Sequence, residues 1–175
     1  MVYSEPSEAV TGNGDQPSPL TVSFDSDTKD KRMTVQHKLS CADIVPYAME
    51  HRLNEMQEMW DVFCGIENPS DEITEDSFHE YGLSFDYVDE GDDDNNYFRY
   101  QISYGGPSEE IRFFCYKNHF GEWVFSEAEF VYMDWFDGAS EMITGNHQVF
   151  VQEIFEFFNE IGSLDEEFKK ATDWM

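Results

Sequence analysis

Residues 81–104, YGLSFDYVDEGDDDNNYFRYQISY, decide the fold, because their apolar side chains recur at every second position. In chain order these side chains are Tyr81, Leu83, Phe85 and Tyr87, then Phe98, Tyr100, Ile102 and Tyr104. A period of two is typical of half-buried strands. The stretch therefore predicts two neighbouring antiparallel strands, joined by the acidic loop 89–96.

Two further strands are expected downstream. Gly105-Gly106-Pro107-Ser108 turns the chain into a strand over residues 110–117, and residues 118–121 turn it again into a long run over 122–136. The alternation of this run slips near Glu127, which predicts a bulge or a bend there. The four segments together predict a four-stranded antiparallel meander.

Helical periodicity flanks the predicted strands. Ser40 or Asp43 can cap a helix whose apolar residues recur every three or four positions up to a stop at Gly65. A second apolar stripe runs over residues 146–161. We expect an α+β fold, in which an N-terminal and a C-terminal helix pack on the meander. The wide apolar face of the last helix can also serve a homodimer.

The composition divides the chain into an arm and a domain. Residues 1–39 are rich in Ser, Pro, Gly, Thr and Asp, and they predict a flexible or loosely attached N-terminal arm. Residues 40–175 contain most of the 16 Phe, 9 Tyr and 4 Trp, far more aromatic residues than a disordered acidic segment carries. They predict a single acidic α+β domain.

The negative charge belongs to this domain. The whole chain has 38 acidic and 10 basic residues, a net charge of −28. The first 40 residues hold six acidic and four basic side chains, so residues 41–175 hold 32 and six, a net of −26. Such a surface repels phosphates and anionic lipid headgroups. We therefore expect a basic partner, and neither direct nucleic-acid binding nor membrane binding.

The polar residues form no catalytic or metal-binding pattern. The five His pair in neither an HxxxH nor an HExxH motif, and the three Cys are widely spaced. A calcium-binding loop that began at Asp89 would need Gly in place of Asp94 and Glu in place of Tyr100. No nucleophile elbow or phosphate-binding loop occurs. We predict a protein that is not an enzyme, with no catalytic residues, no metal and no cofactor.

The sequence also predicts a cytoplasmic protein. Residues 1–15 have neither the basic start nor the apolar run of a signal peptide, and no segment approaches the roughly 18 apolar residues of a membrane span. An odd number of scattered cysteines indicates reduced thiols rather than a disulfide framework.

Rows of carboxylates are the candidate partner-binding residues. Carboxylates two apart on a strand, or four apart on a helix, lie about 6–7 Å apart and roughly imitate a phosphate backbone. We expect these rows to share one continuous electronegative face. The candidates are Asp86, Asp89, Glu90, Asp92, Asp93, Asp94, Glu109, Glu110, Glu127, Glu129, Asp134, Asp137, Glu153, Glu156 and Glu160.

In charge, size and aromatic content the domain resembles the DNA-mimic anti-defence proteins of phages and plasmids, such as the ArdA and Ocr antirestriction proteins and acidic anti-CRISPR proteins. Residues 104–113 and 134–138 are also reminiscent of small proteins on mobile elements. The resemblance implies an inhibitor that blocks the DNA-binding surface of a host defence complex, either a CRISPR effector or a restriction enzyme, in the host cytoplasm.

Other readings of the acidic composition remain open. An immunity protein or antitoxin that neutralises a basic nuclease toxin would have similar electrostatics. A halophile enzyme would also be acidic and poor in Lys, although such chains favour small apolar residues over Phe. In each binding hypothesis the partner is a basic DNA- or RNA-binding protein.

Overall fold

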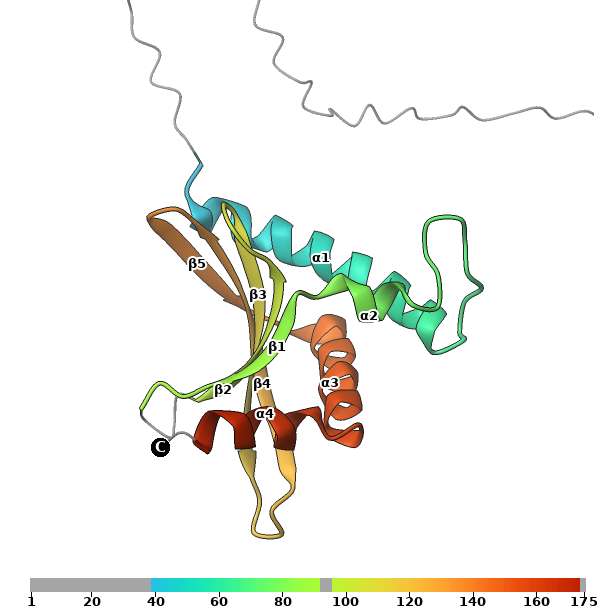
Figure 1. The fold of residues 1–175 in the computed structure, drawn as a ribbon. Helices are drawn as coiled ribbons and strands as arrows, with labels where there is room; N and C mark the ends of the chain where they lie inside the picture. The colour runs from blue at the N-terminus through green and yellow to red at the C-terminus, as the bar shows by residue number, and fades with distance from the viewer. Residues whose placement is uncertain (1–38, 92–95, 174–175) are drawn as a thin grey trace, which may run out of the picture. The chain divides into compact units, whose positions relative to one another are not determined.

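The computed structural model describes residues 39–91 and 96–173, which form an α+β domain (Figure 1). Its centre is a five-stranded antiparallel sheet in which sequential strands are neighbours. The strands are β1 (Ser84–Val88), β2 (Tyr97–Ser103), β3 (Ser108–Lys117), β4 (Trp123–Asp134) and β5 (Asp137–Met142). The α+β class and the meander are therefore confirmed, with one strand more than the four predicted.

The extra strand arises because the predicted run over 122–136 ends in a hairpin. Trp135 and Phe136 form a two-residue turn, and Asp134 pairs directly with Asp137. Trp135 adopts a left-handed φ of 56°, which lets the chain reverse within two residues. Such turns usually carry Gly or Asn, and an aromatic pair gives no turn signal in the sequence.

The limits of the first two strands also differ from the prediction. Residues Ser77–Tyr81 form the short helix α2, so β1 begins at Ser84 and not at Tyr81. The Tyr81 hydroxyl donates a hydrogen bond of 2.7 Å to Glu55, which holds this residue against the first helix. At the other end Tyr104 lies beyond β2 and is exposed.

The predicted irregularity near Glu127 is confirmed. Phe114 pairs with Glu127, but the next residue on β3, Cys115, pairs with Phe125. Ser126 is therefore the extra residue of a bulge.

The first helix, α1 (Cys41–Phe63), begins after Ser40, one of the two predicted caps, and a capping box holds its start. Ser40 accepts a hydrogen bond from the backbone of Asp43, and Asp43 accepts one from the backbone of Ser40. Hydrogen bonds from the Ser40 side chain and backbone lower the pKa of the Asp43 carboxyl. The helix ends before Gly65, whose φ of +70° favours glycine.

The C-terminal helical region consists of two helices, α3 (Gly145–Glu160) and α4 (Ser163–Thr172). Only the first is predicted by the sequence. Gly162, with a φ of +82°, separates them. Helix α4 packs its Phe168 ring 5.1 Å from Tyr87 of β1 and 5.3 Å from Trp123 of β4.

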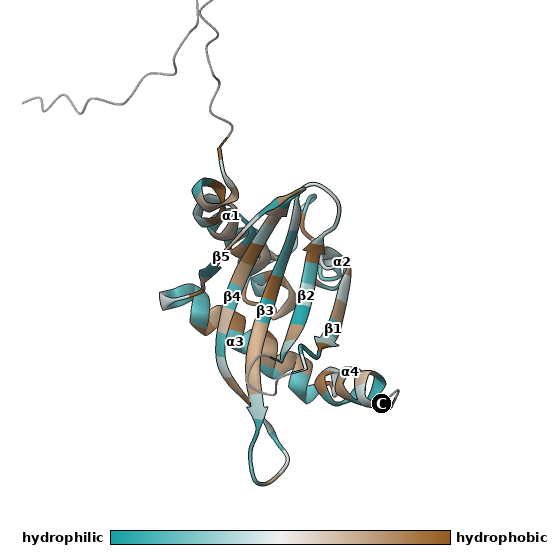
Figure 2. Ribbon diagram, turned by 90° about the vertical axis from the view of Figure 1, so that its left-hand side faces the viewer, coloured by the Kyte–Doolittle hydropathy of each residue, from teal (hydrophilic) through white to brown (hydrophobic). Residues whose placement is uncertain are grey.

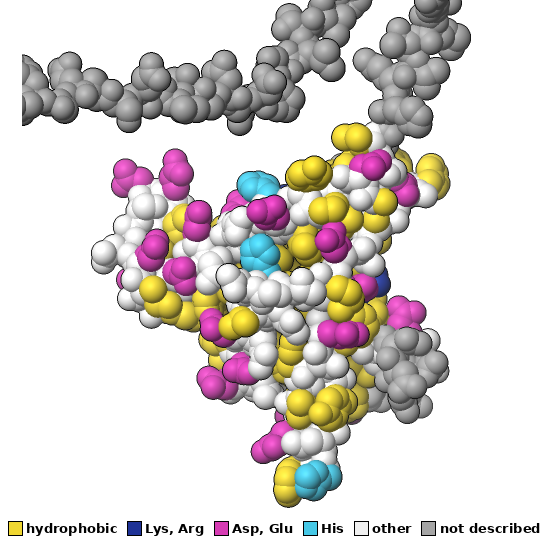
Figure 3. All heavy atoms as spheres, turned by 180° about the vertical axis from the view of Figure 1, so that it is seen from behind, with side chains coloured by type: hydrophobic (Ala, Val, Ile, Leu, Met, Phe, Trp, Pro, Cys, Tyr) yellow, Lys and Arg dark blue, Asp and Glu magenta, His cyan; other side chains and the backbone are white. Residues whose placement is uncertain are grey.

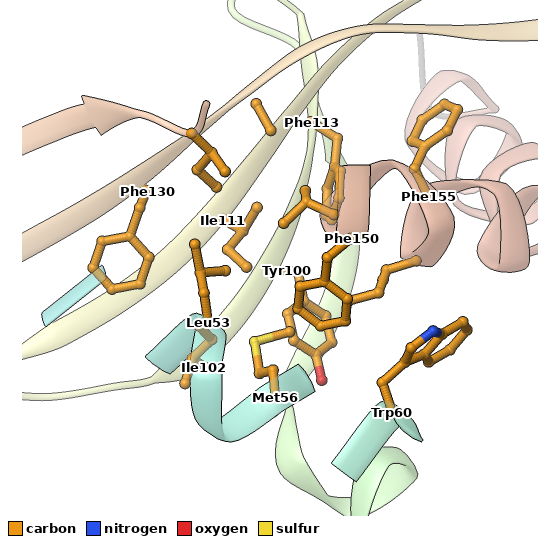
Figure 4. Packing of buried hydrophobic residues seen from close by; sticks show 14 of the residues in the cluster. Leu53, Met56, Trp60, Tyr100, Ile102, Ile111, Phe113, Phe130, Phe150 and Phe155 are labelled. Carbon is orange, nitrogen blue, oxygen red and sulfur yellow. The ribbon is translucent and has the colours of Figure 1, made fainter. Parts of the chain in front are cut away.

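The helices cover one face of the sheet, and the opposite face is open (Figure 2). The core lies between the helices and the sheet (Figure 4), where Leu53 and Met56 of α1 and Phe155 of α3 meet Ile111 and Phe113 of β3. The centre of the α3 stripe that suggested a homodimer packs within the chain itself, whereas Ile161 at its end is 57% exposed. Its buried residues are Phe150, Val151, Ile154 and Phe155.

Part of what the sequence predicts lies outside the described residues. Residues 1–38, most of the predicted arm, belong to this part, as do Asp92, Asp93 and Asp94 of the predicted acidic set.

The contact between Gly82 and Tyr100 gives a test of the packing. A Cβ at Gly82 would overlap the buried Tyr100 ring, although the backbone of Gly82 would otherwise accept any residue. We expect Gly82→Ala to lower the free energy of unfolding by about 1–3 kcal/mol in chemical denaturation. Gly138→Ala is the control, because its Cβ would meet Met133 at an ordinary 3.5 Å. Equal stability of the two variants would contradict this packing.

Candidate partner-binding surface

Most of the basic side chains of the domain are paired with carboxylates of the same chain. All six Lys and Arg of residues 41–175 lie in the described part, and five of them form ion pairs with carboxylates. The five are Arg52, Arg99, Arg112, Lys117 and Lys170. The domain therefore combines a large surplus of carboxylates with few positive charges, and five of those six charges lie beside a carboxylate.

Glu109 and Glu110, two predicted partner-binding residues, are buried in the fold. Glu109 is 5% exposed and Glu110 is 2% exposed. As neighbours on β3 they point to opposite faces of the sheet. Neither can contact a partner, so both are removed from the candidate surface.

Each buried glutamate has an arginine as its partner. Arg52 of α1 donates a 2.9 Å hydrogen bond to Glu109 on the helix side of the sheet. Arg112 donates a 2.7 Å bond to Glu110 on the open side. Burial opposes the charge of Arg52, but hydrogen bonds to Glu109 and Glu55 outweigh burial and raise the pKa of its guanidinium. The pairing is required, because a buried carboxylate without a partner is strongly unfavourable.

The open face of the sheet is close to electrically balanced. Arg99 pairs with Asp86 at 2.6 Å, and Arg112 bridges from Glu110 to Glu129 at 3.2 Å. Two predicted residues, Asp86 and Glu129, are thus partly neutralised. A hollow of about 380 Å³ lies beside Arg112 and is lined by Tyr97, Phe114, Glu90 and Glu129. This face is the least electronegative candidate.

A more acidic surface lies on the helical side. Glu153, Glu156 and Glu160 project from the exposed face of α3, at the spacing of one helix side. Asp61 of α1 is close to them. The pKa of the Cys64 thiol is raised mainly by burial, and further by the nearby charges of Asp61 and Glu153.

These glutamates border an apolar hollow of about 320 Å³. Trp60 and Phe157 form part of its wall, and the adjacent Ile66 is 71% exposed. None of its lining residues is a Lys or Arg. We call the hollow and its three glutamates the α3 surface.

The remaining predicted residues are exposed or half-buried on loops and strand ends. Asp89 and Glu90 lie on the β1–β2 connection, Glu127 lies at the bulge of β4, and Asp134 and Asp137 flank the β4–β5 turn. Asp137 accepts a 2.7 Å hydrogen bond from the backbone of Cys41, so it also fixes the start of α1.

The described members of the predicted acidic set therefore do not form one continuous face. Glu129 and Asp86 lie on the open side of the sheet, whereas the α3 glutamates lie on the opposite side. On the face that Figure 3 shows, acidic side chains are spread out, with apolar and uncharged side chains between them. The reason is geometric: adjacent strand residues point to opposite faces, and α3 lies across the core from the open face.

Sequence reasoning missed two groups of exposed apolar residues. Ile66 follows α1 and meets α3 only through the fold. Tyr104 and Trp135 lie on separate turns that the sheet brings together. The sequence feature that could have indicated Tyr104 and Trp135 is their position next to or within turns, where small polar residues are usual.

Two of the three cysteine thiols are held in the neutral form. Burial raises the pKa of Cys115 to about 12 and also raises the pKa of Cys41, so these thiols are weak nucleophiles. The described part of the chain brings no three His, Cys, Asp or Glu side chains into an arrangement suited to a metal ion. Within the same residues, no helix has the length and apolar content that crossing a membrane requires.

Comparison with protein-family models, with curated proteins and with solved structures finds no match for this chain.

The Arg52–Glu109 pair generates a stability prediction. Arg52→Met leaves Glu109 buried without its cation, and we expect a loss of about 2–4 kcal/mol in the free energy of unfolding. Adding Glu109→Gln should restore at least half of the loss, because the buried charge is then gone. Lys170→Met, at an exposed pair, should change stability little. Failure of the second substitution to rescue the first would contradict this account of the pair.

Proposed function

We propose that this protein is a non-catalytic inhibitor that occupies the basic, nucleic-acid-binding surface of another protein in the cytoplasm. The observation that carries the proposal is the large surplus of carboxylates, together with the pairing of most cations within the chain. Residues 41–175 contain 32 acidic and six basic side chains, and five of the six basic ones are held in ion pairs. Such a surface attracts a positively charged partner and repels nucleic acid.

The amount of charge suits competition with DNA. A duplex carries about one charge per 1.7 Å, so a net charge of −26 corresponds to roughly 44 Å, or about 13 base pairs. A folded domain of this length has a diameter of about 35–40 Å. The domain therefore holds about as much net negative charge as a duplex of its own length. This charge is distributed over several faces.

The α3 surface is the part of the domain that best suits a stable contact. Its glutamates supply the steering and specificity that charge gives to an interface. Its apolar hollow, with Trp60 and Phe157 in the wall and Ile66 at the edge, supplies the desolvated centre from which most binding energy comes.

The proposed target is a host defence complex, either a CRISPR effector or a restriction enzyme. The resemblance in charge and aromatic content to DNA-mimic anti-defence proteins supports this target class. A basic nuclease toxin would present a similar surface, and the experiment below separates the two.

The test is competition for protein-bound DNA. Purified protein is added to duplex bound by a panel of restriction enzymes, CRISPR effectors and nuclease toxins, and displacement is measured by gel shift. We expect displacement from a defence complex, weaker at about 500 mM salt than at about 50 mM, and no binding of free duplex. Displacement only from a toxin would favour the immunity reading. Displacement from none, or binding of duplex, would overturn the proposal.

A charge-matched pair of variants tests the α3 surface. Reversal of Glu153, Glu156 and Glu160 to Lys should weaken inhibition at least about tenfold. Reversal of Asp71, Glu72 and Glu75 to Lys is the control, since it changes the net charge equally on an exposed loop. Equal effects of the two triple variants would show that net charge alone acts and that the α3 surface has no special role.

A further inference from the structure

Two turns at one end of the sheet carry an exposed aromatic cluster that the proposed function does not use. Tyr104 follows β2 and is 86% exposed, and Trp135 lies in the β4–β5 turn and is 83% exposed. They line one hollow of about 490 Å³, whose other walls include Gly106, Ser108 and Met133. This volume lies within the range of sites that bind small groups or single side chains.

The conformation of Trp135 favours a role in binding. Its φ of 56° is left-handed, which is rare and unfavourable for a residue with a large side chain. Gly or Asn would make the same two-residue turn without strain. The chain instead places an indole there and leaves it mostly in solvent, so the strain is not offset by burial. Backbone strain of this kind concentrates at functional sites.

Gly106 keeps the hollow open between the indole and a carboxylate. A Cβ at this position would lie 3.1 Å from Nε1 of Trp135 and 3.5 Å from Oδ1 of Asp134. The edge of the indole and the carboxylate therefore both lie against the backbone of Gly106. The hollow thus combines two aromatic rings, a thioether and a glycine backbone, and the Asp134 carboxylate lies next to its Gly106 wall.

We propose that this hollow binds an arginine side chain of the basic partner. A guanidinium can stack on the faces of Trp135 and Tyr104 through cation–π contact, and the net negative charge of the domain favours a cation at this hollow. A planar, weakly hydrated guanidinium suits this arrangement better than a lysine ammonium. A nucleobase could also stack on the rings, but its phosphates would be repelled by the acidic domain.

This inference rests on the proposed function only in that the partner is basic. The hollow lies at the turns after β2 and β4, and it shares no lining residue with the α3 surface on the helical layer. The two sites can therefore be tested separately.

The test follows the Trp135 indole N–H in NMR spectra of the ¹⁵N-labelled full chain. The probes are blocked peptides that alternate Gly with Arg, with Lys or with Gln, and a short single-stranded oligonucleotide. We expect a saturable shift with the Arg peptide, a smaller one with the Lys peptide, and none with the Gln peptide or the oligonucleotide. Equal responses to Arg and Lys, a response to the Gln peptide or the oligonucleotide, or no response at all would overturn the proposal.

Variants assign the response to the hollow. Tyr104→Ala should weaken binding of the Arg peptide about tenfold. Phe120→Ala, at an exposed aromatic on the β3–β4 hairpin, should leave it unchanged. Trp135→Gly identifies the indole signal by its loss, and its melting temperature should be unchanged or higher, because Gly accepts the left-handed φ. An unchanged affinity in Tyr104→Ala would contradict the site.

The results also separate this inference from the proposed function. If the protein displaces no DNA but the Trp135 signal responds to the Arg peptide, inhibition by competition fails and the arginine site remains. If DNA is displaced and the indole does not respond, the arginine site fails and the inhibitor remains.

Discussion

The pairing of two buried glutamates with two arginines is the constraint on which the surface of this protein depends. Glu109 and Glu110 are adjacent on β3 and point to opposite faces, so each needs its own cation. Arg52 of α1 and Arg112 of β3 meet this need, and the pair of Arg52 with Glu109 also ties the helix to the sheet. These pairs commit two of the six basic residues of the domain to carboxylates of the fold. The folded core thus contributes to the acidic character of the surface.

The regular part of the fold could be predicted because period and capping are local signals. The alternation in β2, the Ser40 capping box and the slip near Glu127 each depend on residues close in sequence. The β4–β5 turn could not be predicted, since Trp135 and Phe136 give no turn signal and their conformation depends on the strands that they join. Helix α4 was missed for a similar reason: its apolar residues are few, and contacts with β1 and β4 stabilise it.

The acidic character of the domain could be predicted from composition, but the positions of the exposed carboxylates could not. Composition fixes the net charge, and the basic partner inferred from it stays a prediction. It does not indicate which carboxylates are exposed, since the burial of Glu109 and Glu110 depends on an arginine 57 residues away and on one from the same strand. It also does not place Ile66 beside α3. Glutamates at helical spacing on α3 were the most reliable part of the prediction, because one side of an exposed helix stays on one side of the molecule.

The surplus of carboxylates is expected to leave no positive potential on the described surface, even around the exposed Lys169 and Lys170 of α4. This expectation is tested most directly by NMR measurement of near-surface electrostatic potentials, in which cationic and anionic paramagnetic cosolutes are compared at each backbone amide. Our account predicts negative potentials over both the helical layer and the open sheet face, with the smallest magnitude around Arg99 and Arg112. A positive potential over these two arginines would contradict it, because their charges would then be available to a partner.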